Sequence, residues 1–303
     1  MNKKIALLFN LLIFLPVIIY AETYWGGELP NIRNTQLKAE VSLVGDVYTY
    51  SYTVTSGSTN TGQIWSFDID IRQPQGSLEL SGEGLVNGPG YLKHTSAQVL
   101  SEPTTPKMIP VGLFSPSNWN SGPDILGQVG WGADDDQDMI YPGRSLGGFQ
   151  ITSRGLPGIR DFRIEPDLIP PSEESDITIE QIQEVEDKVA FKGKTIGPTA
   201  PPANFKPIDF LNYIIDLKHQ SVSLGWIKNE GIENSLDAKM ENAGKKIEAG
   251  DTKTAKNILN AFINEVEAQG CETYEKCPEG KHLTPEAYAL LKYNVRYLIE
   301  QLK

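Results

Sequence analysis

The period of the hydrophobic pattern changes part-way along the chain, and this change constrains the fold more than any other feature. From residue 36 to residue 165, large apolar residues alternate with polar ones, most clearly over 48–54 and 65–71. Such alternation is typical of half-buried antiparallel strands. Further short strands are expected at Glu40–Leu43, Met108–Leu113, Leu126–Trp131, Gly147–Thr152 and Gly158–Ile164. With turn-forming residues between them, these strands predict an immunoglobulin-like β-sandwich, and a closed barrel remains the alternative.

From residue 207 to the end, the apolar residues recur with a helical period. Residues 211–215 mark a first amphipathic helix, and residues 232–247 mark a second. Asp251 is placed to cap a third, and Thr284-Pro285-Glu286 has the order of cap, first-turn proline and first-turn acid that begins a fourth. The chain is therefore predicted to be α+β in two separate domains, with the sandwich followed by a small four-helix bundle.

Between these two parts lies a strongly acidic stretch that ends in Gly197-Pro198-Thr199-Ala200-Pro201-Pro202. A run of like charges is usually solvated, and a Pro-rich spacer excludes helix. We therefore expect four regions: a signal peptide over 1–21, a β-sandwich over 22–165, an acidic Pro-rich linker over 166–206 and a helical bundle over 207–303.

Three segments of the C-terminal region resemble the FIMAH-type helical domain. They are GIENSLDAKM at 231–240, AKNILNAFINEVEAQ at 255–269 and LTPEAY at 283–288. The resemblance covers about residues 205–302 and implies an exported bacterial or archaeal protein. It implies no reaction, since such domains accompany enzymes and non-enzymes alike. The connection over 271–281 is longer than is typical of the family.

The N-terminus has the three parts of a secretory signal peptide. Two lysines precede an apolar segment over residues 5–20, and the small residue Ala21 follows it. A membrane anchor is the competing interpretation, but this segment is short and contains Asn10 and Pro16. We expect cleavage after Ala21, no stable membrane insertion afterwards, and a secreted or periplasmic protein.

An oxidising compartment favours a disulfide between the two cysteines, Cys271 and Cys277. A zinc site is the alternative, but only His282 lies near them in the sequence. The net charge of −12 makes nucleic acid and anionic lipid poor partners, because both need a basic surface.

Alternating carboxylates at Asp134, Asp136 and Asp138 offer oxygen ligands to a hard cation such as Ca²⁺. The segment is not an EF-hand, because no glutamate occupies the twelfth position. Apart from this Ca²⁺, no cofactor is expected. The competing interpretation is an acidic loop on an acidic protein.

Trp119, flanked by Asn118 and Asn120, falls in a predicted loop, where an exposed indole could stack on a sugar ring. Core packing is the alternative for this tryptophan. Residues 143–147 match the G-x-S-x-G pattern of a hydrolase, with Ser145 as nucleophile, but no strand-to-helix turn is predicted there.

We therefore expect no catalytic residue and a non-enzymatic exported protein with a binding or structural role. Its partner would be an envelope polymer or an extracellular protein. The alternatives are a polysaccharide-binding module that uses the sandwich loops and a secreted hydrolase.

Overall fold

The computed structural model describes residues 28–303 except for 84, 86–92, 95–107, 124–126 and 169–177. The predicted signal peptide over 1–21 lies outside the described residues. Within this part of the chain, no helix is both long enough and apolar enough to cross a membrane.

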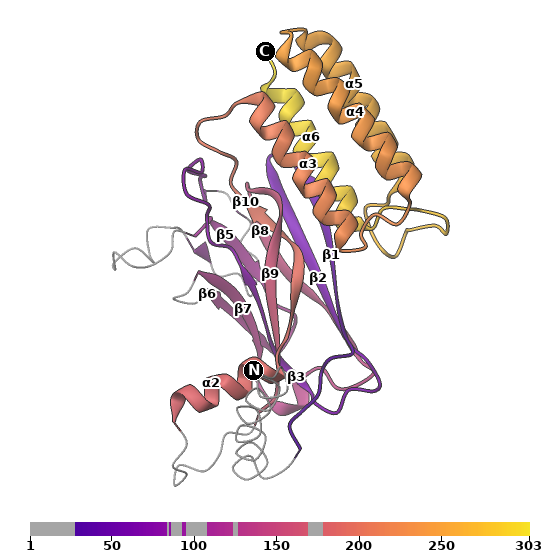
Figure 1. Cartoon of the computed structure of the whole chain (residues 1–303). Coiled ribbons are helices and arrows are strands. Elements are labelled where there is room, and N and C mark those ends of the chain that lie inside the picture. Colours follow the sequence, from indigo (N-terminus) through magenta and orange to yellow (C-terminus); the bar gives the residue numbers. More distant parts are fainter. Residues whose placement is uncertain (1–27, 84, 86–92, 95–107, 124–126, 169–177) are drawn as a thin grey trace, which may run out of the picture.

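In the described part of the chain, ten antiparallel strands form the two five-stranded sheets of an immunoglobulin-like sandwich (Figure 1). The first sheet has the order β1 (Thr35–Val44), β2 (Val47–Ser56), β8 (Ser145–Ser153), β5 (Val111–Phe114) and β4 (Lys93–His94). The second has the order β10 (Phe191–Thr199), β9 (Leu156–Pro166), β3 (Ile64–Asp70), β7 (Gln128–Ala133) and β6 (Trp119–Pro123). The predicted sandwich is confirmed.

The core between the sheets is aromatic. In β2 every second residue is buried, as the period-two pattern predicts. Tyr52 meets the edge of Phe67, and the Phe67 ring stacks on Trp131 with ring centroids 5.0 Å apart. One expectation is wrong: the alternation over 65–71 predicts that Trp65 shares this buried face, but Trp65 is 41% exposed. The register between β3 and β9 shifts between Ile64 and Ser66, and such a bulge turns the next side chain to the other face.

The region predicted to be a linker is largely structured, which corrects the prediction for 166–206. It contains helix α2 (Ile179–Val189) and the edge strand β10. Thr178 and Gln181 form a capping box that starts α2. Ile196 of β10 is fully buried in the core, so only the segment after this strand remains as a connection to the helices.

The C-terminal helices are α3 (Pro207–Ser223), α4 (Glu230–Glu248), α5 (Thr252–Gln269) and α6 (Pro285–Gln301). The side chain of Asp251 accepts a hydrogen bond from the backbone of Thr254, and that of Thr284 accepts one from Ala287. Both predicted caps are therefore confirmed. α3 and α6 lie next to the sandwich, whereas α4 and α5 form an outer layer (Figure 1).

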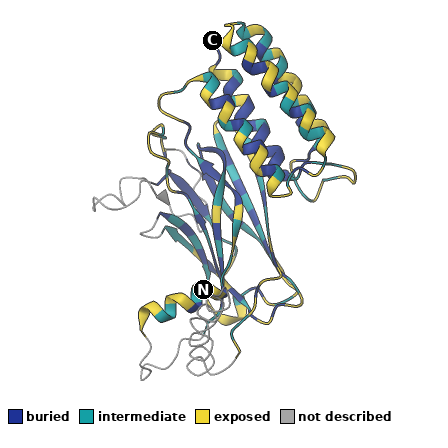
Figure 2. Cartoon of the chain, viewed as in Figure 1, coloured by how far each residue is buried: buried dark blue, intermediate teal, exposed yellow. Residues whose placement is uncertain are grey.

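Helix α6 is buried on nearly every side, because it lies between the other helices and the sandwich (Figure 2). From Ala287 onward, its buried apolar residues belong to one hydrophobic cluster that continues into strands β1, β2 and β9. The two domains therefore share a continuous core.

Candidate functional site

The predicted ligand-binding loop is held together by its own side chains. Asn118 donates a hydrogen bond from its amide to Asp138 Oδ1 at 2.8 Å, and Asn120 donates one to Asp134. Trp119 is only 4% exposed, donates from its ring nitrogen to the Asp138 carbonyl at 3.0 Å, and packs edge-on against Phe149. The prediction of an exposed, sugar-stacking Trp119 is therefore wrong, because the core takes up its indole.

The three carboxylates proposed for Ca²⁺ are not gathered into a site. Asp136 and Asp138 begin and end a short 3₁₀ turn, and the carboxylates of Asp134 and Asp138 are engaged by the two asparagines. Across the part of the chain that the structure describes, no group of three or more His, Cys, Asp or Glu side chains is placed to hold a metal.

Ser145 lies on strand β8 rather than on a strand-to-helix turn. Its hydroxyl shares a hydrogen bond with that of Thr55, at 2.8 Å, on the neighbouring strand β2. The histidines at 219 and 282 belong to the helical part of the chain. A serine bonded in this way across two strands lacks the geometry of a nucleophile elbow.

The disulfide loop connects the two domains. Cys271 and Cys277 are bonded, as predicted. Between them, the backbone N–H of Tyr274 donates to Glu40 Oε1 at 2.6 Å, and the Lys38 ammonium lies 4.7 Å from the centre of the Tyr274 ring. Both partners belong to strand β1, so the disulfide loop fixes the helices to the sandwich.

Glu286, in the first turn of α6, is the polar centre of this junction. It is 3% exposed, and its Oε1 accepts hydrogen bonds from the backbone N–H of Ala39 at 3.0 Å and from the hydroxyl of Tyr274 at 2.8 Å. Burial, and then the charge of Glu286, raise the pKa of Tyr274 well above its usual range. Tyr274 therefore stays protonated and remains a donor to the carboxylate.

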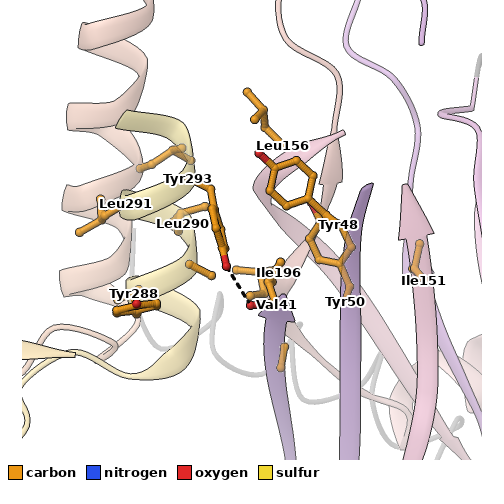
Figure 3. Packing of buried hydrophobic residues seen from close by; sticks show 14 of the residues in the cluster. Val41, Tyr48, Tyr50, Ile151, Leu156, Ile196, Tyr288, Leu290, Leu291 and Tyr293 are labelled. Atoms are coloured by element: carbon orange, nitrogen blue, oxygen red, sulfur yellow. Dashed lines mark hydrogen bonds between the residues drawn. The ribbon is translucent and has the colours of Figure 1, made fainter. Parts of the chain in front are cut away.

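About two turns further along the helix, α6 makes a second set of contacts with the sandwich. Tyr293 points from α6 toward β1, where its hydroxyl lies 3.5 Å from the Val41 carbonyl, and its ring meets the edge of Tyr48 (Figure 3). Asn294 is fully buried and donates its amide to the Pro157 carbonyl of β9 at 2.8 Å. Hydrogen bonds and aromatic packing thus hold α6 on the sandwich.

A pocket of about 350 Å³ opens at this junction, which is the size of a small-molecule site. It lies between the segment after β3, the connection from β10 to α3, and helices α3 and α6. Its lining comes from both domains: Pro74, Gln75, Gly76, Ser77, Leu156, Thr199, Ala200, Pro201, Pro202, Asn204, Lys206, Asp209, Phe210, Tyr213 and Asn294. We take this junction pocket as the candidate functional site.

Charges near the pocket are largely compensated. At its wall, the ammonium of Lys206 lies 3.7 Å from the carboxylate of Asp209. Arg160 donates to the backbone carbonyls of Pro198 and Arg72. Burial raises the pKa of Tyr213 and the charge of Arg160 opposes this rise, so the tyrosine is a neutral hydroxyl at ordinary pH.

Sequence reasoning missed the residues that build this site. The sequence marks Glu286 only as the first-turn acid of the last helix, and no pattern points to Tyr213, Tyr293 or Asn294. One available signal was the composition of α6, which carries apolar residues all around its axis, and a helix of that kind is normally buried on every side.

The comparisons with known proteins agree with this architecture. Residues 211–300 match the family model of the FIMAH domain. The C-terminal helical region is therefore similar to the FIMAH domain over these residues. This match confirms the resemblance seen in the sequence, and it spans less than half of the chain.

A solved structure is weakly similar to this chain. It is the crystal structure of an uncharacterized protein from Nocardia farcinica with an immunoglobulin-like fold, 11% identical, with a TM-score of 0.25 over 52% of this chain and 95% of that chain. This likeness is too distant to bear on function. No curated protein matches the chain. A FIMAH domain beside an immunoglobulin-like sandwich suggests a structural or binding protein.

Proposed function

We propose that this is an exported, non-enzymatic protein that binds a partner at the cell envelope or outside the cell, with both domains acting as one rigid unit. The observation that carries the proposal is the junction: Glu286 and the disulfide loop fix the FIMAH domain on strand β1. A fixed junction gives the two domains one preorganised surface, which lowers the entropic cost of binding.

Two further features support the proposal. The hydroxyl of Ser145 and the carboxylates of Asp134 and Asp138 are engaged in local hydrogen bonds rather than aimed into a cleft. The apolar leader that ends at Ala21 and the disulfide both fit export into an oxidising compartment.

Export is tested by expressing the full chain in a bacterial host and measuring the mass of the product outside the cytoplasm. We expect a chain that begins at residue 22. The matched control replaces Lys3 and Lys4 with glutamate, which removes the positive charges and should leave the chain uncleaved inside the cell. Equal export of both chains would contradict the prediction that residues 1–21 are a signal peptide.

Binding is tested by sedimenting the exported chain with protein-free bacterial cell wall. We expect retention that is lost when the junction is opened by Glu286→Ala but kept in Glu300→Ala, an exposed residue of the same helix. A screen of esters and glycans, with Ser145→Ala as reference, should show no turnover. Turnover that Ser145→Ala abolishes without changing stability would replace the proposal with a hydrolase.

A further inference from the structure

The junction pocket has apolar walls around a small number of polar groups. Leu156, Pro201, Pro202 and Phe210 contribute carbon surface from both domains (Figure 1 shows how α3 and α6 cover this end of the sandwich). A site of this composition holds a ligand by its carbon skeleton and orients it through the few polar groups. The identity of those groups therefore decides which ligand fits.

The first polar group is the amide of Asn294. Its nitrogen donates to the carbonyls of Pro157 and Leu290, at 2.8 and 2.7 Å, which fixes the orientation of the amide. Its oxygen is buried and has no hydrogen-bond partner among the described residues. Leaving a buried acceptor unpaired costs free energy, and Asn294 is one of the residues that line the pocket, so a ligand that brings a donor to this side chain is favoured.

The second polar group is the hydroxyl of Tyr213, which also lines the pocket. This hydroxyl makes no hydrogen bond to any other described residue. The ring of Tyr213 packs against the ring of Phe210, with the two centroids 5.7 Å apart. The aromatic contact positions the tyrosine, and its hydroxyl is left to bond a ligand.

We propose that this pocket binds a neutral sugar ring, an inference that goes beyond the proposed envelope role. A sugar hydroxyl both donates and accepts, so one ring can donate to the Asn294 oxygen and accept from Tyr213. The C–H face of the ring packs on Phe210 and the prolines. Because Lys206 and Asp209 compensate each other at the wall, neither sign of charge on a ligand is favoured there, and an anion without a donor would also leave the Asn294 oxygen unpaired.

The test uses the exported chain and isothermal titration calorimetry with glucose, galactose, mannose and N-acetylglucosamine. Glucuronate and glucosamine serve as charged comparators. We expect saturable binding of at least one neutral sugar and weaker binding of both comparators. Tyr213→Phe should weaken that binding about tenfold, the effect of losing one hydrogen bond. The matched control is Tyr141→Phe, which removes an exposed hydroxyl bonded to the Asp136 carbonyl, away from the pocket.

The variant Tyr213→Phe keeps the ring contact, so its fold should be unchanged and unfolding in urea should match the unaltered chain. The proposal is overturned if no neutral sugar binds at about 10 mM, a concentration that would reveal even millimolar affinity. It is equally overturned if Tyr213→Phe binds as well as the unaltered chain. Neither result would change the outcome of the cell-wall sedimentation experiment, which tests the proposed function separately.

Discussion

Glu286 connects three elements. It belongs to helix α6, and its carboxylate accepts hydrogen bonds from strand β1 and from the disulfide loop. Removing it leaves the Ala39 N–H and the Tyr274 hydroxyl without their acceptor in a buried place. We predict that Glu286→Ala lowers the free energy of unfolding by about 2–4 kcal/mol. Urea unfolding of the exported chain measures this loss.

The matched control is Glu300→Ala, because the pair between Glu300 and Arg296 is exposed on the same helix and such pairs contribute about 0.5 kcal/mol or less. Glu286→Gln keeps one acceptor oxygen and should fall between the two variants. If Glu286→Ala were as mild as Glu300→Ala, the junction would not depend on this carboxylate.

Tyr48 makes the junction sensitive to alkali. Burial, then the charge of Glu300 and the neighbouring Tyr293, raise the pKa of its hydroxyl well above the value of about 10 in an unfolded chain. A raised pKa contributes stability that is complete below pH 10 and is lost as the pH rises further, because the unfolded chain then releases the proton first. We predict that Tyr48→Phe reduces this loss by about 1.4 kcal/mol per pH unit.

Urea midpoints measured at about pH 8, 10 and 11 give this slope. Leu224→Ala provides the comparison, because it changes an exposed side chain that does not titrate and should leave the slope as it is in the unaltered chain. Equal slopes for Tyr48→Phe and Leu224→Ala would show that Tyr48 releases its proton as readily in the folded chain as in the unfolded one.

Among the elements, strand β10 shows where the sequence misleads. Its Gly197-Pro198 sequence is typical of a breaker, but β10 is an edge strand, and there a proline loses no hydrogen bond that the sheet requires. Gly158 on the paired strand β9 has room for no side chain, because a Cβ would lie 2.1 Å from the hydroxyl of Thr199. Edge pairing of this kind depends on partners distant in sequence and cannot be inferred from local pattern.

Ile196 tests whether β10 is an integral part of the sandwich. Its side chain is fully buried, so we predict that Ile196→Ala costs about 2–4 kcal/mol of stability. Lys194→Ala, two residues earlier on the same strand, alters an exposed ion pair with Asp161 and should change stability by about 0.5 kcal/mol or less. Thermal or urea unfolding compares the two. If both variants changed the stability equally little, β10 would not be an integral part of the sandwich.

The helices illustrate the opposite case, because their limits depend on local chemistry. Asp251 and Thr284 cap α5 and α6 where the sequence predicts, since a cap needs only its own first turn. The predictions for Trp65 and Trp119 are wrong because the local sequence does not show what surrounds either side chain. The alternating pattern does not reveal the bulge in β3, and a tryptophan in a polar segment does not reveal that the core reaches it.

At the scale of the whole molecule, the docking of the two domains cannot be predicted from the sequence pattern. Ala39 and Glu286 are bonded across 247 positions of the chain, and neither shows a pattern that marks a partner. The regions on either side of the junction were predicted as separate domains joined by a linker. The buried face of α6 means instead that each domain completes the core of the other.

A shared core predicts cooperative unfolding of the sandwich and the helices. Near-ultraviolet circular dichroism reports the packed Trp119 and Trp131 of the sandwich, and far-ultraviolet circular dichroism reports the helices. We predict that both signals follow one transition in urea, because the helices cannot separate from the sandwich without exposing the apolar surface of α6.

Tyr293→Ala removes the aromatic contact with Tyr48 at the centre of the junction and should separate the two transitions. The control Leu224→Ala changes an exposed side chain of the helical part and should keep them together. Two transitions in the unaltered chain would mean that the domains fold independently, and a pocket built from both would then lose the rigidity that binding requires.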